Sequence, residues 1–193
     1  MTRGNIPAVL KPSAFLIVML LPGCVAFSAQ RENKIEHLIR LLHDRLALAS
    51  EIAKAKFNSG AKVNDPNREA LVLAAAMKQA TGFGVDAGEA RKLFVAQIES
   101  SKIAQAAFIH MWAGQPKFDP IPDLVRDIRP KLDKLTTSIL AALKAAQPEL
   151  RSQRARRIVE AATRTDAFDG PYAYAFRSAW AVAVSPVARA ASR

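Results

Sequence analysis

Cysteine is almost absent from this sequence, since Cys24 is the only one in 193 residues. A single cysteine cannot form a disulfide within the chain or assemble a cysteine-based metal cluster. Histidine is also scarce, and no HExxH pattern connects the three that occur, which are His37, His43 and His110. We therefore expect no metal site.

Acidic residues are few relative to basic ones. The chain has 17 Asp and Glu against 28 Lys and Arg, which gives a formal net charge of +11. That balance suits an anionic partner, and composition leaves open whether this is nucleic acid, an acidic membrane surface or an anionic small molecule. With 50% hydrophobic residues, the chain is long enough for one domain with a proper core.

A long apolar run is also missing near the N-terminus. Residues 14–21 are apolar but too few to span a bilayer comfortably. They follow Arg3 and Lys11 and precede small residues, which is the order of a secretory signal peptide. We therefore expect residues 1–29 to be removed. The alternative, a buried N-terminal helix, is disfavoured by Pro12 and by a Pro-Gly pair after the run.

The end of the same segment contains a lipoprotein-like motif. Leu21-Pro-Gly-Cys24 resembles a bacterial lipoprotein box, although Pro22 is unusual there, and Cys24 would be the acylated residue. Cleavage and lipidation both place the working domain outside the cytoplasm, starting near Gln30. We expect a periplasmic or secreted protein that meets a membrane only if Cys24 is lipidated.

Helical spacing of apolar residues dominates the rest of the chain, and the alternation typical of strands is absent. The pattern predicts an all-α, single-domain bundle of about six helices over residues 30–193. The expected helices cover residues 31–57, 65–82, 86–112, 124–143, a basic segment from 148, and 171–184, with a Pro-rich connector at 114–122.

Charged side chains interrupt the apolar stripe of the first predicted helix. Arg45 and Lys56 are three turns apart, so they share one face and lie roughly 16 Å apart along the axis. They fall in line with Leu42 and Ile52, which should pack inward. Because an unpaired buried cation is very costly, each needs an anion.

The other predicted helices add further polar groups. Leu93, Gln97, Ser101 and Gln105 form an i, i+4 row inside the apolar face of the third helix, and the polar members must be satisfied. Near the starts of two other helices lie four more charged residues, Asp65, Arg68, Glu69 and Arg129.

Each of these residues also has a purely structural interpretation. A long cation can bury its stem and keep its head in water, and Asp65 can serve only as an N-cap. Glu69 lies one position beyond that of a capping box, so capping does not explain it. Their number favours a binding site. Three cations (Arg45, Lys56 and Arg129) and a polar row are expected to point inward, and few carboxylates lie on the same helix faces. A bound dianion would supply the missing negative charge.

These motifs together resemble one known family. They are Asp44-Arg-Leu-Ala-Leu-Ala-Ser-Glu-Ile-Ala-Lys-Ala-Lys56, Asp65-Pro-Asn-Arg-Glu69 and Gln97-Ile-Glu-Ser-Ser-Lys-Ile-Ala-Gln105. The chain is similar to the exported class of all-helical chorismate mutases from Leu42 to Gln105 and again over residues 128–135. The resemblance implies a type II-like fold, with catalytic helices in residues 30–115 and a second helical half in 120–193. It also implies a pocket formed by one chain.

The resemblance further implies roles for matching residues. Arg45 and Arg129 would bind the two carboxylates of chorismate. Lys56 would reach a carboxylate and the ether oxygen, to which Gln105 would also donate. Glu69 would accept a bond from the ring hydroxyl. The remaining lining residues would be Asp65, Arg68 and Ser101.

The implied reaction fits the residues present. Chorismate becomes prephenate in one concerted step, so no cofactor, nucleophile or general base is needed. The sequence agrees, because it has no recognisable Ser/His/Asp or Cys/His set. The protein must hold the reactive conformer and stabilise negative charge on the ether oxygen.

Other interpretations stay open. A non-catalytic helical binding module is one, because Arg151, Arg154, Arg156 and Arg157 form a basic cluster, although such a run is usually a solvated face. The other interpretations are a catalytically inactive member of the same family and an enzyme that acts on a related substrate such as isochorismate. Export argues against nucleic acid as the partner. A homodimer is compatible with the sequence.

Overall fold

The structure is a computed structural model that describes residues 33–164 and 173–192. Their regular secondary structure is helical and includes no strand, which confirms the all-α prediction. The elements in this part of the chain are α1 (Lys34–Ala47), α2 (Ala49–Ser59), α3 (Pro66–Gly82), α4 (Ala87–Met111), the π-helical turn η1 (Leu124–Ile128), α5 (Arg129–Ala146), α6 (Gln153–Arg164) and α7 (Ala173–Ala191).

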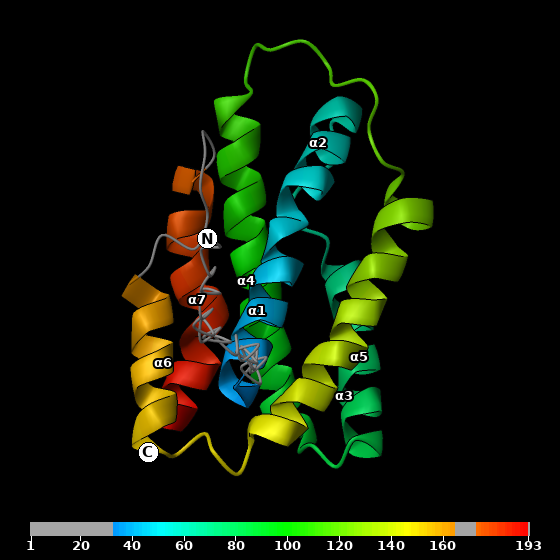
Figure 1. Cartoon of the computed structure of the whole chain (residues 1–193). Coiled ribbons are helices and arrows are strands. Elements are labelled where there is room, and N and C mark those ends of the chain that lie inside the picture. Colours follow the sequence, from blue (N-terminus) through cyan, green and yellow to red (C-terminus); the bar gives the residue numbers. More distant parts are fainter. Residues whose placement is uncertain (1–32, 165–172, 193) are drawn as a thin grey trace, which may run out of the picture. The chain divides into compact units, whose positions relative to one another are not determined.

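Helix α4 is the central element of this bundle. It packs along α7 on one side and against α2 and α3 on the other, and it also contacts α1 (Figure 1). Helix α5 packs on α1 and α3, while α6 packs on α7 and α1. The core residues all lie between Ile35 and Ala191, so this part of the chain forms a compact unit with its own core.

Large apolar side chains from three helices fill the centre of the core. Burying each of them contributes roughly 1.5–3 kcal/mol to stability. Those with almost no exposed surface include Leu38, Leu42, Leu46, Leu93, Phe94, Phe108, Ile139 and Leu140. The apolar residues whose helical spacing predicted the helices are therefore the residues that form the core.

The first predicted helix is divided in two. It starts at a capping box, in which Ile35 donates its amide to the Asn33 side chain and Glu36 accepts from the Asn33 amide. A break at Leu48 then separates α1 from α2, although Leu48 keeps right-handed helical dihedrals. Apolar spacing continues through this position, which explains why the sequence predicts one helix.

Local sequence signals set the other boundaries well. Gly60 ends α2 with a φ of 70°, a left-handed conformation that glycine adopts without cost. Asp65 caps α3, and Pro66 occupies its first turn, as predicted. The last helix was predicted to stop at Val184 but runs on through Pro186. Burial of Val187 beyond the proline offsets the lost hydrogen bond.

The connector between α4 and η1 is fixed at its middle by one side chain. The Asn58 Nδ2 donates to the Phe118 carbonyl oxygen at 2.7 Å, and the Phe118 amide donates to the Asn58 Oδ1 at 3.0 Å. The ring of Phe118 also packs edge-on against Trp112, at 4.6 Å between centroids. This contact ties the start of the second half of the bundle to α2.

Two predictions concern parts of the chain outside the bundle. The expected signal peptide and the lipoprotein-like motif at Cys24 lie outside the described residues. Among the residues that are described, no helix is both long enough and apolar enough to cross a membrane.

We expect Asn58→Ala to lower the free energy of unfolding by roughly 1–3 kcal/mol, because two part-buried backbone groups of Phe118 lose their partner. Urea denaturation followed by circular dichroism measures the change. The matched control is Asn64→Ala, an exposed position whose replacement should change stability by less than about 0.5 kcal/mol. Equal effects of the two substitutions would contradict the role given to Asn58.

Candidate active site

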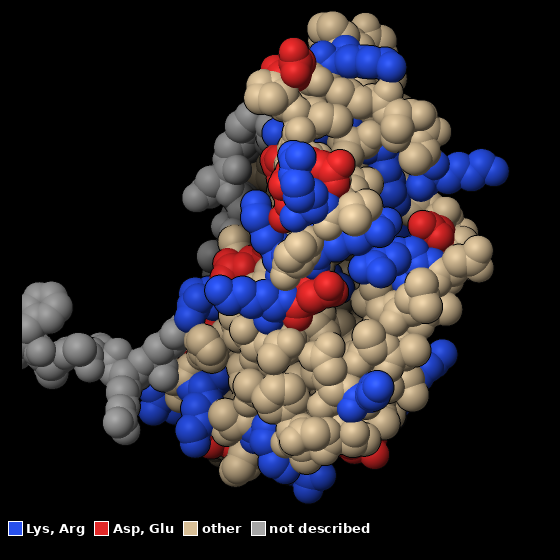
Figure 2. Space-filling model, turned by 90° about the vertical axis from the view of Figure 1, so that its right-hand side faces the viewer, with Lys and Arg blue, Asp and Glu red and all other residues tan. Residues whose placement is uncertain are grey.

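A cavity lies between the first five helices and the π-helical turn. Its empty volume, including the part open to solvent, is about 760 Å³. Figure 2 faces the side of α3 and α5, where Lys and Arg side chains gather with some carboxylates across the middle of the surface. The lining residues are Arg45, Ile52, Lys56, Val63, Asp65, Arg68, Glu69, Val72, Ile98, Ser101, Lys102, Gln105, Leu124, Ile128, Arg129 and Leu132.

Positive charge exceeds negative charge in this lining. Five of the lining residues are Lys or Arg, and two are carboxylates. Neither Arg68 nor Arg129 forms an ion pair within the described part of the chain, while Lys102 contacts Glu69 at 3.4 Å between Nζ and Oε2. The cavity therefore suits an anion with more than one negative group.

Arg45 is the most deeply placed of these cations. Its side chain is 6% exposed, and its guanidinium lies 5.7 Å from the centre of the Phe94 ring. Burial lowers the pKa of Arg45 to about 10, with Asp133 opposing the shift and Arg68 adding to it. The Nε atom has no hydrogen-bond partner among the described residues. Arg45 stays charged at neutral pH and is incompletely paired.

Lys56 lines the same cavity from the next helix, α2. Its Nζ donates to the Val63 carbonyl oxygen at 2.8 Å, which leaves two of its three donors for other partners. Partial burial lowers the pKa of Lys56, while the carboxylates of Asp65 and Glu69 raise it and Lys102 lowers it. The two nearby carboxylates thus favour the charged ammonium that the pocket needs.

The carboxylates of α3 have structural partners as well as a place in the lining. The Asp65 Oδ1 accepts from the Arg68 amide at 3.1 Å, which is the predicted N-cap. The Glu69 Oε1 accepts from the Asp65 amide at 3.2 Å. Glu69 therefore does contribute to capping, contrary to the sequence argument. Its side chain is long enough to reach back to the Asp65 amide from one position beyond that of a capping box.

The predicted polar row of α4 is divided between two surroundings. The Gln105 Nε2 donates to the Ser101 Oγ at 2.9 Å, and both residues line the cavity. Gln97 instead donates to the Ala183 carbonyl oxygen of α7 at 3.1 Å, outside the cavity. The division follows from the packing of α4 between α7 and the cavity, since the row drifts around the helix.

Arg129 reaches the cavity from the second half of the chain. It adopts right-handed helical dihedrals (φ −57°, ψ −44°) although a residue before proline usually avoids them. Its amide donates to the Leu124 carbonyl oxygen, five residues back, in the π-helical turn. This wider turn accommodates Pro130, which has no amide to donate, and it directs the half-buried Arg129 into the lining.

All eight residues predicted for the site line this one cavity. Lys102 was missed, because its i, i+3 spacing from Glu99 is typical of an exposed ion pair, and the structure does contain that pair at 3.0 Å. The apolar walls were missed too, since nothing distinguishes them from core residues in sequence. The basic cluster at residues 151–157 contributes nothing to the lining.

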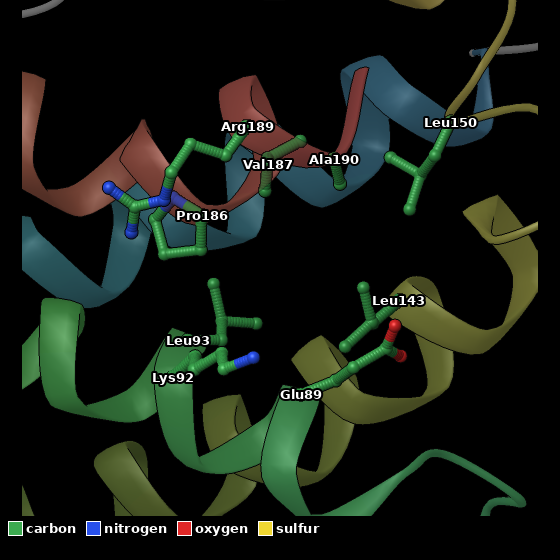
Figure 3. A pocket seen from close by; sticks show the side chains of 9 residues that line it. All are labelled: Glu89, Lys92, Leu93, Leu143, Leu150, Pro186, Val187, Arg189 and Ala190. Carbon is green, nitrogen blue, oxygen red and sulfur yellow. The ribbon is translucent and has the colours of Figure 1, made fainter. Parts of the chain in front are cut away.

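A second cavity lies between α4, α5 and α7, with an empty volume of about 650 Å³ (Figure 3). Leu93, Leu143 and Val187 face it from three helices, and charged groups stand at its edge. One of these, Glu89, already accepts a hydrogen bond from Gln147 at 2.9 Å. No residue predicted for the site lines this cavity, and no sequence pattern indicates it.

The described residues thus define an all-helical protein with a cationic cavity suited to a small anionic molecule. Comparisons identify the family within that class. The sequence profile of chorismate mutase type II matches residues 36–106. A protein named secreted chorismate mutase, from Mycolicibacterium smegmatis, is 30% identical over 158 residues, which cover 79% of this chain and 87% of that protein.

Solved structures agree with this assignment. Chorismate mutase from Burkholderia thailandensis is 35% identical with a TM-score of 0.68, and the match covers 80% of this chain and 98% of that one. Chorismate mutase from Burkholderia phymatum is 32% identical with a TM-score of 0.70, covering 81% and 96% of the two chains. The chain belongs to the chorismate mutase family.

Replacing Arg45 by methionine tests the cost of the buried cation. We expect Arg45→Met to leave the stability of the ligand-free protein unchanged or raise it by up to about 3 kcal/mol, because an apolar side chain needs no partner there. The cost of burying the charged arginine is fully present at neutral pH, far below its pKa of about 10. Urea denaturation at neutral pH measures the change in the free energy of unfolding.

The control for this experiment is Arg91→Met, at an exposed position of the same helix bundle. It removes one positive charge without relieving any burial and should change stability by less than about 0.5 kcal/mol. A large destabilisation in Arg45→Met alone would show that Arg45 is well paired in the free protein.

Proposed function

We propose that the protein converts chorismate to prephenate outside the cytoplasm. The observation that supports this most is a cavity lined by five cations and two carboxylates, with Arg45 buried and incompletely paired. Chorismate carries two carboxylates, so it would offset the excess charge that the free protein tolerates. Relatives named as chorismate mutases make this the preferred dianion.

Binding in this proposal begins with the two carboxylates. Arg45 and Arg129 approach the cavity from α1 and α5, so they can hold carboxylates at two separate points. Each charge-assisted hydrogen bond contributes roughly 1.5–3 kcal/mol. Holding both ends of the molecule selects the folded conformer, in which the carbons that form the new bond are close together.

Rate acceleration then requires donors at the ether oxygen. The Lys56 ammonium and the Gln105 amide each spend one N–H in the free protein and retain others for the substrate. As the C–O bond breaks and the C–C bond forms, negative charge grows on that oxygen, and donors fixed in a partly buried cavity stabilise it strongly. No proton changes hands, so the pocket needs no general base.

The other lining residues complete the proposed site. Glu69 would accept from the ring hydroxyl of the substrate, and its contact with Lys102 holds that carboxylate at the wall of the cavity. Ser101 orients the Gln105 amide through their 2.9 Å hydrogen bond. Asp65 and Arg68 stand at the start of α3, where the cap between them fixes the approach of the helix to the cavity.

Location outside the cytoplasm is part of the same proposal. It is supported by the signal-like order of residues 1–29 and by relatives named as secreted enzymes. Acylation of Cys24 and dimerisation are further expectations from the sequence. An N-terminal sequence of the exported protein, with its mass, would decide the cleavage site and the acylation together.

We expect Lys56→Ala to lower kcat/KM for chorismate by at least roughly 10²-fold, the scale for loss of one key donor. Loss of chorismate absorbance and formation of prephenate measure the rate. The control is Lys62→Ala, which removes an exposed lysine near the same cavity and should leave the rate unchanged. Near-normal turnover in Lys56→Ala would remove it from the mechanism, and no turnover in the parent protein would direct the assay to isochorismate.

The pH dependence of kcat/KM is a separate test. Lys56 must be protonated, and burial lowers its pKa from 10.5, so activity should be retained through neutral pH and fall on the alkaline side. Gln105 has no titratable proton, so no acid pH is required. A sharp acid optimum would contradict the role of Gln105.

A further inference from the structure

The outer face of α6 carries positive charge that no part of the active site uses. Arg151, which lies just before α6, and Arg154 and Arg157 on α6 are here called the basic patch; they follow one another at intervals of three residues and are exposed. None of them forms an ion pair or side-chain hydrogen bond with the described residues. One carboxylate, Glu160, interrupts the surface of this helix. The patch is therefore a fully solvated cationic surface.

The helix beneath the patch is held in a fixed orientation. Its inner face buries Ala155 and Val159, and it packs on α7 and α1. The Trp180 Nε1 of α7 donates to the Ala162 carbonyl oxygen at 2.8 Å. Because the apolar face is already buried, the helix cannot rotate it into a bilayer, and the patch can bind a partner only through charge.

The start of the described chain lies beside the same surface. Lys34, at the beginning of α1, forms an ion pair with Glu149 at 3.0 Å, two residues before the patch begins. At the other side, the Arg156 Nε donates to the Ala191 carbonyl oxygen at 3.4 Å. Figure 1 shows the starts of α1 and α6 at the same end of the bundle. A chain entering at Asn33 therefore enters next to the patch.

We propose that the basic patch docks the protein on an anionic phospholipid bilayer. Exposed cations close to a membrane of anionic lipid each add to the attraction, without any need for a shaped pocket. Cys24 precedes Asn33 by nine residues, which reach at most about 30 Å when extended. An acyl chain at Cys24 would hold the patch near the same membrane, and two weak signals together give stable anchoring.

Docking in this way leaves the catalytic cavity open. No residue of α6 lines the cavity, which is built from α1 to α5 and η1. The two sites also suit different ligands. The basic patch suits a surface with many negative groups, whereas the cavity suits one small dianion. The membrane proposal therefore stands independently of the proposed reaction.

The test uses residues 30–193, which contain the whole core and lack Cys24, so acylation cannot contribute. Sedimentation with vesicles of phosphatidylglycerol and phosphatidylcholine is compared with vesicles of phosphatidylcholine alone. We expect binding to the anionic vesicles only, and its loss at about 1 M salt, where the screening length is about 3 Å. Replacing the patch by Arg151→Gln, Arg154→Gln and Arg157→Gln should weaken binding on the order of 10²-fold.

The matched control removes the same charge from other exposed positions, through Lys62→Gln, Lys78→Gln and Lys117→Gln. It should weaken vesicle binding by less than about threefold, and both triple variants should keep the helical circular dichroism and the mutase activity of the parent. Equal weakening by the two variants would overturn the proposal, because net charge alone would then explain binding. Absence of vesicle binding, or binding to nucleic acid without vesicle binding, would overturn it as well.

Discussion

The active site depends on a cation that the protein does not fully pair. Arg45 is buried with its Nε unsatisfied, next to a cavity in which positive charge already dominates. Such an arrangement costs stability in the free protein, because burial penalises the charged form. The cost becomes binding energy when an anion enters, since the partner then completes the pairing. Binding of an anion by this chain thus begins from an unfavourable ground state of the empty site.

The rest of the bundle is arranged so that it can hold this cavity. The long helix α4 packs its apolar face on α7, and Gln97 adds a hydrogen bond across that contact, so the other face can carry Ser101 and Gln105. Separate ties hold the second half of the chain in place. Asn58 fixes the connector, and the Lys144 Nζ donates to the Gly84 carbonyl oxygen at 2.7 Å. Arg129 therefore arrives on a supported helix rather than on a loop.

The sequence predicts those parts that a single helix determines. Arg45 and Lys56 share a face because of helical periodicity, and the break at Leu48 does not remove either from the cavity. Asp65 is predictable because an N-cap before proline is a local signal. What depends on several helices at once is not predictable in this way. Examples are the departure of Gln97 toward α7 and the entry of Lys102 into the lining, both of which depend on how neighbouring helices pack around α4.

Two of the regions that contribute to the net charge of +11 differ in physical character. In the cavity, cations are partly or wholly buried and are positioned by contacts such as that of Lys56 with the Val63 carbonyl oxygen. In the basic patch, the arginines are exposed and form no ion pair or side-chain hydrogen bond with the described residues. Salt screens exposed charges far more than buried ones. The cavity can therefore keep its preference for a small dianion under conditions in which the surface of α6 loses its attraction for a larger partner. Composition reports only the sum over the whole chain, which is why the net charge alone could not choose between an anionic small molecule and an anionic surface.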